Sequence, residues 1–305
     1  MSKIVVIGSS NTDIVIKSRS LPKPGETVLG EDYLMNPGGK GANQAVAAAK
    51  LGGSVAFIAK VGDDDFGRGA RQNFARFGID VSHISIDPDK PSGVAAIMVD
   101  DAGENSISVA PGANNALGVS EVKDALPVIE AANVVLLQLE SPLETVEFAI
   151  RSSRGLGKTV ILNPAPACAL PGEFIAQLDV ITPNETEAEI LSGIPVKSIE
   201  GARKAAEVLK AMGVRAVVLT LGARGAFVLS DAFDGLIPVE PADAIDTTAA
   251  GDTFNGALAV ALAEGRAIEH AVAFANRAGA ISVTRMGAQA SAPFREELPE
   301  PEIKI

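Results

Sequence analysis

Short apolar runs alternate with longer segments of helical spacing along most of this chain of 305 residues. The runs are apolar on both faces and end at Gly, Asn or Asp, which is typical of strands buried inside a sheet. They occur at 4–7, 55–58, 134–139, 159–162, 180–182 and 216–220. The helical patterns between them occupy 41–51, 66–77, 121–132, 143–154 and 201–212. This alternation predicts an α/β fold with a largely parallel central sheet covered by helices on both faces.

Two segments depart from this alternation and predict extra strands outside the main sheet. Segment 12–37 has apolar runs on either side of a turn, the second of them at 27–29, and segment 92–110 has the pattern of a hairpin with a turn-rich loop. We expect these two segments to form a small inserted β-sheet that acts as a lid. The rest of the chain would form one α/β body made of residues 1–11, 38–91 and 111–305.

The composition limits the compatible functions. Hydrophobic residues make up 47% and charged residues 21%, which predicts a packed core rather than disorder. The net charge of −12 does not suit binding to nucleic acid or to anionic membranes. The single cysteine, Cys168, excludes an internal disulfide and a cysteine-based zinc site. Because no apolar run resembles a signal peptide or a membrane span, we expect a cytoplasmic protein without nucleic-acid or membrane partners.

Segment 246–258, Asp-Thr-Thr-Ala-Ala-Gly-Asp-Thr-Phe-Asn-Gly-Ala-Leu, places an acid beside a glycine at a predicted helix start. Small residues there let a ligand approach the backbone, and the free N–H groups and the helix dipole favour an anion. Asp252 could take a proton from a hydroxyl while these amides hold the phosphoryl group that the hydroxyl attacks. Considered alone, the segment fits equally well with Asp252 as a first-turn acid that the dipole favours.

Polar residues follow several predicted strands, at the sheet edge where parallel α/β folds bind their ligands. They are Asn11, Glu140, Asn163, Asn184 and Thr220. Asn11 and Asp13 have an alternative interpretation as turn residues. Asn184 and Glu187 also have two interpretations: they cap a helix, or they order Mg²⁺ and phosphate through water. The segment Ser141-Pro-Leu-Glu144 predicts a capping box, which leaves Glu140 free to point at a ligand.

Two glycine-containing loops are candidates for contacts with a ligand. Segment 36–44 has glycines that allow unusual backbone angles before a helix, and Lys40 and Asn43 offer donors from its first turn. It is not a Walker A loop, because a glycine follows Lys40 where that motif requires Ser or Thr. In segment 220–225, two glycines permit a tight turn and a close approach to a nucleotide.

Together these segments resemble the ribokinase family of sugar kinases, also called the PfkB superfamily. The matches are Gly-Gly-Lys-Gly-Ala-Asn-Gln-Ala at 38–45, Asn-Pro-Ala-Pro-Ala at 163–167, Thr-Pro-Asn-Glu-Thr-Glu-Ala at 182–188, Asp-Thr-Thr-Ala-Ala-Gly-Asp-Thr-Phe-Asn-Gly-Ala at 246–257 and Thr-Arg-Met-Gly-Ala-Gln-Ala-Ser at 284–291. They cover essentially the whole chain in order. The resemblance implies a ribokinase-like fold whose β-lid closes over the sugar and commonly forms a dimer contact.

The resemblance also implies roles for the residues at matching positions. Asp252 would be the general base and Gly251 part of the anion hole. The sugar would be held by Asn11, Asp13, Gly39, Lys40, Asn43, Glu140 and Asp252. ATP would contact Asn184, Thr220, Gly222, Gly225, Gly251 and Asn276. Asn184 and Glu187 would organise Mg²⁺. An activating monovalent cation, usually K⁺, would be bound mostly through backbone carbonyls by Asp246, Thr248, Ser282, Arg285, Gly287 and Ser291.

The implied activity is ATP-dependent phosphorylation of D-ribose at O5, which gives D-ribose 5-phosphate and ADP, in a homodimer joined through the lid. One alternative is a kinase of 2-deoxyribose, fructose or adenosine. Adenosine suits the chain less well, because with 4% aromatic residues and no Trp there are few rings to stack on a second purine. The other alternative is a catalytically silent sugar sensor, against which the intact Asp252 and nucleotide segments argue.

Overall fold

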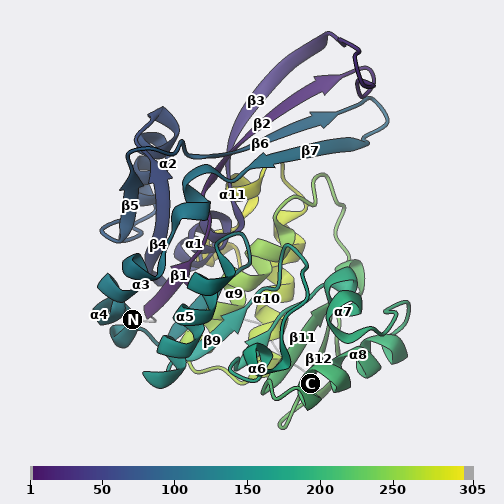
Figure 1. The fold of residues 1–305 in the computed structure, drawn as a ribbon. Helices are drawn as coiled ribbons and strands as arrows, with labels where there is room; N and C mark the ends of the chain where they lie inside the picture. The colour runs from purple at the N-terminus through teal and green to yellow at the C-terminus, as the bar shows by residue number, and fades with distance from the viewer. Residues whose placement is uncertain (1–2, 299–305) are drawn as a thin grey trace.

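The central sheet of the computed structural model, which describes residues 3–298, follows the predicted alternation (Figure 1). It has nine strands in the order β13–β12–β11–β10–β9–β8–β1–β4–β5. All pairs from β11 to β5 are parallel, and only β12 and β13 run antiparallel to their neighbours. The strands are β1 (Lys3–Ile7), β4 (Ser54–Gly62), β5 (Ile84–Asp87), β8 (Val134–Leu137), β9 (Thr159–Leu162), β10 (Val180–Ile181), β11 (Ala216–Thr220), β12 (Ala226–Ser230) and β13 (Asp234–Ile237).

Helices cover both faces of this sheet, because successive residues of each strand point into two different cores. In β1, Ile4 and Val6 belong to one core and Val5 and Ile7 to the other. The first core is covered by α1 (Lys40–Lys50), α2 (Asp65–Arg76), α9 (Ala250–Ala263) and α10 (Ile268–Ser282). The second is covered by α3 (Val119–Asp124), α4 (Leu126–Ala131), α5 (Leu143–Gly155), α6 (Gly172–Ile175), α7 (Glu185–Ser192) and α8 (Ile199–Ala211). The predicted fold class is therefore confirmed.

Three 3₁₀ turns and one further short helix complete the elements within residues 3–298. These are η1 (Gly112–Ala116), η2 (Gly222–Arg224), η3 (Arg295–Glu297) and α11 (Ala288–Ser291). Among residues 3–298, no helix combines the length and the apolar character that a bilayer crossing requires.

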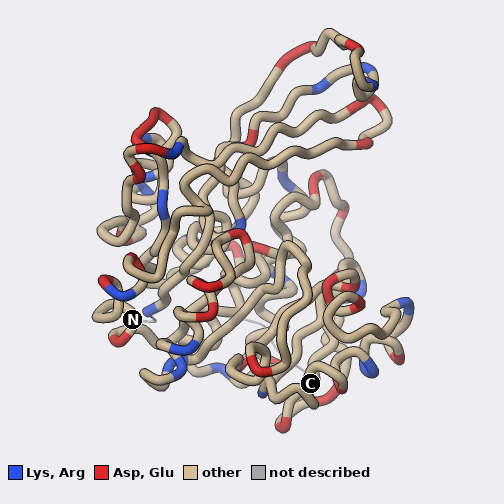
Figure 2. The backbone as a smooth tube through the Cα atoms, in the orientation of Figure 1, with Lys and Arg blue, Asp and Glu red and all other residues tan. Residues whose placement is uncertain are grey.

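A second, four-stranded sheet projects from the body (Figure 1). Its order is β3–β2–β6–β7, built from β2 (Asn11–Ser18), β3 (Gly30–Gly38), β6 (Gly93–Val99) and β7 (Asn105–Ala110). β2 pairs antiparallel with β3 and parallel with β6, which pairs antiparallel with β7. Charged residues gather toward the far end of this sheet, whereas the strands are mostly uncharged along their length (Figure 2). We refer to these four strands as the small sheet.

Several predicted elements differ from the observed ones. The apolar run at 27–29 is not a strand, since β3 begins only at Gly30. The helix expected at 121–132 is two helices, and Pro127 lies in the first turn of the second, where its missing N–H is tolerated. The strand expected at 134–139 ends at Leu137, because Gln138 turns its side chain toward another amide and Leu139 N donates to the Ala165 carbonyl.

The capping box predicted at 141–144 is wrong. α5 begins at Leu143, after Pro142, and no side chain caps it. The Ser141 hydroxyl is buried and has no hydrogen-bond partner within residues 3–298. The prediction failed because the spacing of Ser141 and Glu144 matched the motif while the helix starts one residue later than the motif requires.

Candidate active site

The polar residues predicted at strand ends lie along one edge of the central sheet. β1, β8, β9, β10 and β11 are adjacent and parallel, so their carboxyl ends meet there. Asn11, Glu140, Asn163 and Asn184 follow the first four of these strands, and Thr220 is the last residue of β11. α1 and α9, which contact each other, begin at the same edge and carry Lys40, Asn43, Gly251 and Asp252.

Asp252 is a buried acid in the first turn of α9. Its Oδ2 accepts a hydrogen bond from Asn43 Nδ2 at 3.0 Å, and its Oδ1 accepts one from Gln44 Nε2 at 2.9 Å. Burial raises the pKa of Asp252, while the Lys40 ammonium and these two amides oppose the rise. A carboxyl group whose pKa moves toward neutrality is suited to accept a proton from a substrate hydroxyl.

The N-terminus of α9 presents free amides next to this acid. Its cap residue, Ala249, has a φ of 57°, and it is the only non-glycine residue between 3 and 298 with a positive φ. Thr253 N donates to the Ala249 carbonyl, whereas the amides of Gly251 and Asp252 find no acceptor in the described chain. Free amides at a helix start bind anions. The acid and the anion-binding amides thus share one turn.

Lys40, the first residue of α1, lies in the middle of a cluster of carboxylates. Burial by itself lowers the pKa of the Lys40 ammonium, but the nearby carboxylates, led by Asp252 and Glu140, outweigh burial and raise it. Glu140 Oε2 also accepts from the Lys40 backbone N at 2.9 Å and from Ser9 Oγ at 2.5 Å. The ammonium therefore stays charged where it can offset negative charge on a ligand.

Asn11 and Asp13 reach this cluster from β2, where the small sheet joins the body. Burial raises the pKa of Asp13 to about 6, with Glu140 and Asp252 adding to the rise and Lys40 opposing it. The Asp13 carboxylate lies over Gly38, since a Cβ there would be 2.2 Å from Asp13 Oδ2. Asn11 Oδ1 accepts from Asn114 Nδ2 at 2.8 Å. The structure thus brings together the residues predicted to hold a sugar.

Most candidates for nucleotide contacts lie at or just after the ends of β10 and β11, and Asn276 of α10 contacts the end of β13. Asn184 and Thr220 are paired across neighbouring strands, and Thr220 N donates to the Pro183 carbonyl at 2.9 Å. Gly222 begins η2 and Gly225 follows it, and a Cβ on Gly225 would lie 2.2 Å from the Ile237 carbonyl oxygen. Asn276 Nδ2 donates to the same oxygen at 2.9 Å. Asn276 therefore fastens the end of β13 beside the glycine loop.

Asn184 and Glu187 form the capping box of α7, one of their two predicted roles. Asn184 Oδ1 accepts from Glu187 N at 2.8 Å, and Glu187 Oε2 accepts from Asn184 N at 2.9 Å. Burial raises the pKa of the Glu187 carboxyl, and Asp252 adds to the rise while Lys40 opposes it. Because Glu187 interacts with both, it belongs to the site as well as to the cap. A buried carboxylate with lone pairs to spare fits Mg²⁺ held through water.

The residues predicted to bind a monovalent cation lie in and around two loops, which are connected by hydrogen bonds to Asp246. Its Oδ1 accepts from Thr248 N at 2.9 Å and its Oδ2 from Gly287 N at 2.8 Å. The hydroxyls of Ser282 and Ser291 donate to carbonyls of their own helices, and the Arg285 guanidinium pairs with Glu297. The side chains of Asp246, Ser282, Arg285 and Ser291 are thus engaged with other groups of the chain.

Several residues at the site were not predicted. Gln44 contacts Asp252, although only its neighbour Asn43 was given a role. Asn114, in η1, binds both Asn11 and the backbone of Ser10. Asn255 Nδ2 donates to the Gly251 carbonyl at 2.8 Å and so braces the first turn of α9. Gln44 and Asn255 lie inside the motif segments and could have been considered, but no sequence signal marks Asn114.

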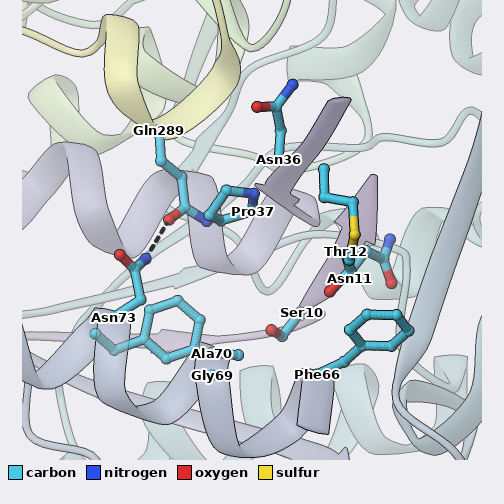
Figure 3. A pocket seen from close by; sticks show the side chains of 12 residues that line it. Ser10, Asn11, Thr12, Asn36, Pro37, Phe66, Gly69, Ala70, Asn73 and Gln289 are labelled. Atoms are coloured by element: carbon cyan, nitrogen blue, oxygen red, sulfur yellow. Dashed lines mark hydrogen bonds between the residues drawn. The ribbon is translucent and has the colours of Figure 1, made fainter. Parts of the chain in front are cut away.

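A hollow lies at the base of the small sheet (Figure 3), and Asp252 is not among the residues that line it. Its walls come from Thr12 and Pro37, from the α2 residues Phe66 and Asn73, and from Gln289 of α11. Asn73 Nδ2 donates to Gln289 Oε1 at 2.8 Å across one wall. Asn11 is the only predicted site residue that lines it.

The site has the elements of a kinase site for a small hydroxylated substrate. These are a buried acid, free amides at a helix start, and polar side chains at the ends of parallel strands that can bind hydroxyl groups. The sequence pattern of the pfkB family carbohydrate kinases matches residues 1–295. The chain belongs to this family of carbohydrate kinases.

Individual relatives share nearly the full length of the chain. A ribokinase of Haemophilus influenzae is 46% identical over 294 residues, which is 96% of each chain. A deoxyribokinase of Salmonella typhi is 38% identical over 298 residues, 97% of each. The structure of Arabidopsis thaliana ribokinase complexed with ribose and ATP superimposes with a TM-score of 0.92 at 33% identity, covering 97% of each chain.

Proposed function

We propose that this chain transfers the γ-phosphoryl group of ATP to O5 of D-ribose, giving D-ribose 5-phosphate and ADP. The similarity to proteins named ribokinase, one of them complexed with ribose and ATP, supports the choice of both substrates. The observation that carries the proposal is the position of Asp252, a buried acid in the same turn as two free amides.

Asp252 acts as the general base in this proposal. It takes the proton of the sugar hydroxyl as the oxygen attacks phosphorus. The amides of Gly251 and Asp252 hold the phosphoryl oxygens as negative charge develops on them, and the α9 dipole adds to this stabilisation. Both effects come from groups that are already in place before the substrates bind.

The sugar is held by Asn11, Asp13, Gly39, Lys40, Asn43 and Glu140. Support comes from Asn43, because its Oδ1 is buried without a hydrogen-bond partner in the described chain while its Nδ2 is fixed to Asp252. Such an acceptor fits a sugar hydroxyl, which would satisfy it. The small sheet closes over this cage as a lid, excludes water and joins two copies into a homodimer, so that the hydroxyl rather than water is phosphorylated.

The nucleotide lies along Asn184, Thr220, Gly222, Gly225 and Asn276. Asn184 and Glu187 hold Mg²⁺ through water, and the ion supplies charge neutralisation on the phosphates. The carbonyls around Asp246, Thr248, Ser282, Arg285, Gly287 and Ser291 hold K⁺. Because Asp246 and Thr248 directly precede the first turn of α9, ordering of this loop also orders the amides of the anion hole.

Measurement of ADP release with and without K⁺ tests the substrate. Ribose, 2-deoxyribose, fructose and adenosine are compared, and ribose is expected to give the highest kcat/KM. The similarity to a deoxyribokinase makes 2-deoxyribose the second candidate. A site with Asp13 and Asn11 placed for secondary hydroxyls should reject a sugar that leaves one of them unpaired. If 2-deoxyribose is the better acceptor, the specificity is revised and the kinase activity stands.

The substitution Asp252→Asn tests the mechanism. It keeps the size of the side chain and its place in the turn but removes the base, so kcat should fall by about 10² to 10⁴-fold. Binding of ATP, measured by calorimetry, should remain. Near-normal turnover in this variant contradicts the assignment of the base, and lack of ADP release from the unaltered chain with every sugar favours a sugar sensor instead.

A further inference from the structure

A chain of buried amides lies behind Asp252, and its central member is Gln44 on α1. Gln44 Nε2 donates to Asp252 Oδ1 at 2.9 Å and to Asn163 Oδ1 at 3.1 Å. Gln44 Oε1 accepts from Gln138 Nε2 at 2.5 Å. Gln44 and Gln138 are both completely buried. Both N–H groups and the oxygen of the Gln44 amide are therefore engaged, and none of its contacts involves solvent.

The orientation of these amides follows from the charge on Asp252. An ionised carboxylate only accepts hydrogen bonds, so the nitrogen of Gln44 must face it. The N–H of Gln138 then meets the oxygen of Gln44. If the Gln44 amide were turned over, its oxygen would face the carboxylate and its N–H groups would face the N–H of Gln138. The Gln138 amide thus donates to Gln44 and the Gln44 amide donates to Asp252, so each orientation enforces the other.

The packing around the two glutamines preserves this arrangement. A Cβ on Gly8 would lie 2.1 Å from Gln138 Oε1, so a glycine at the end of β1 makes room for the Gln138 amide. A Cβ on Gly256 would lie 2.8 Å from the Gln44 backbone oxygen, so α9 crosses α1 closely at this point. Gln138 Oε1 itself has no partner among residues 3–298. Gln138 thus leaves a buried acceptor unpaired while its N–H holds Gln44.

We infer that Gln44 is a positioning residue for Asp252, and that Gln138 fixes the Gln44 amide in the orientation that this requires. The inference rests on the proposed role of Asp252 as general base. Gln44 does not contact the reacting atoms. It acts by holding one carboxylate oxygen in place and by stabilising the ionised form, which is the form that accepts the proton.

A pH profile separates this role from a purely structural one. Loss of a donor raises the pKa of Asp252 further, because the ionised form loses a hydrogen bond. The acid limb of the profile of kcat at saturating ribose, which the effect of Asp13 on sugar binding does not enter, should then move to higher pH by about one to two units, as expected for one hydrogen bond to a charged group. General loosening of the site would lower kcat at every pH without moving the limb.

The experiment compares Gln44→Met and Gln138→Met with the unaltered chain from pH 5 to 9. Methionine has similar length and no N–H, so it removes the donor with little change in volume. For Gln44→Met we expect kcat at saturating ribose to fall by about 10- to 100-fold at pH 7 and to recover partly at higher pH. Gln138→Met should shift the limb in the same direction but less, and the KM for ATP should not change.

Thr145→Val is the matched control. Thr145 is buried on α5, which covers the face of the sheet opposite to α9, and its Oγ1 donates to the Leu117 carbonyl at 2.9 Å. The control loses a buried hydrogen bond, so it should melt at a lower temperature with an unchanged acid limb. If Gln44→Met does not fold, the acid limb of the pH profile of Gln138→Met tests the inference instead.

An unshifted limb in the folded glutamine variants overturns the inference, while the loss of turnover in Asp252→Asn still supports the proposed base. Near-normal turnover in Asp252→Asn overturns both together.

Discussion

At the scale of single residues, the site depends on Gly39, which joins the small sheet to α1. Its φ is 88°, a conformation that other residues rarely adopt. A Cβ there would lie 2.7 Å from the Asn11 backbone N and 2.9 Å from the Ser10 Cα, and neither backbone atom can move independently. The absence of a side chain at this position lets β2 pass against the start of α1, which places Asn11 and Asp13 next to Lys40.

Asp13 provides a prediction on pH dependence. Its pKa of about 6 is raised by burial and by Glu140 and Asp252, so the carboxyl takes up a proton as the pH falls below 6. The KM for ribose should therefore rise below pH 6, because a protonated Asp13 accepts fewer hydrogen bonds from sugar hydroxyls.

Steady-state kinetics on Asp13→Asn check this expectation. At pH 7.5 the variant should have a KM for ribose that is about 10- to 100-fold higher, the effect of one hydrogen bond to a charged group. Its KM should also vary little between pH 5 and pH 7.5, because the titrating group is gone. A variant that keeps the pH dependence of the unaltered chain shows that another group is responsible.

At the scale of elements, the position of Asp252 depends on how closely α9 crosses α1. Gly256, one turn after Asp252, is the contact point, since a Cβ there would lie 2.8 Å from both Ala47 Cβ and the Gln44 backbone oxygen. This crossing brings two segments more than 200 residues apart to within hydrogen-bond distance.

Gly256→Ala tests the importance of the crossing. The added methyl group should push α9 away from α1, lower the free energy of unfolding by about 1–3 kcal/mol and lower kcat, because Asp252 moves from Asn43 and Gln44. Chemical denaturation and turnover measure the two effects. Gly69→Ala on α2 is the control, since nothing lies within 4 Å of its Cβ and alanine favours a helix there by up to about 1 kcal/mol. Equal behaviour of the two variants would contradict the argument.

The elements that carry a clear hydrophobic period were predicted well from the sequence. α1, α2, α5 and α8 lie within two residues of their predicted bounds, because their apolar spacing stops where the helices stop. The break between α3 and α4 was missed because the apolar spacing continues across Pro127. β3 was placed too early because the apolar run at 27–29 resembles a strand, although it has no paired neighbour.

The candidate site was predictable only in part, for a physical reason. Residues at the ends of parallel strands share one edge whatever the details of packing, so the convergence of Glu140, Asn184 and Thr220 follows from topology. The contacts of Gln44 and Asn114 depend instead on how closely helices and turns approach. These distances depend on how side chains from segments remote in the sequence pack together, and a single sequence does not predict that packing.

At the scale of the whole molecule, the small sheet exposes an apolar row that the body does not cover. The register places Val15, Leu34, Ile97 and Ile107 opposite one another across all four strands, on the face that also carries Asp13. Leu34 is 58% exposed and Ile107 56% exposed. A contiguous exposed apolar surface of this kind is typical of a protein contact.

For the proposed homodimer we expect this row to be the contact, because a face that is apolar across its whole width can pair with itself about a two-fold axis. Ile107→Asp should therefore convert a dimer into a monomer, as measured by sedimentation velocity, and should raise the KM for ribose because the lid loses its support. Ser106→Asp is the matched control: Ser106 precedes Ile107 on β7, is also exposed and points to the opposite face. It adds the same charge and should leave the dimer intact. If the unaltered chain sediments as a monomer at micromolar concentration, the dimer is excluded. If the Ile107→Asp variant remains dimeric, the contact lies elsewhere.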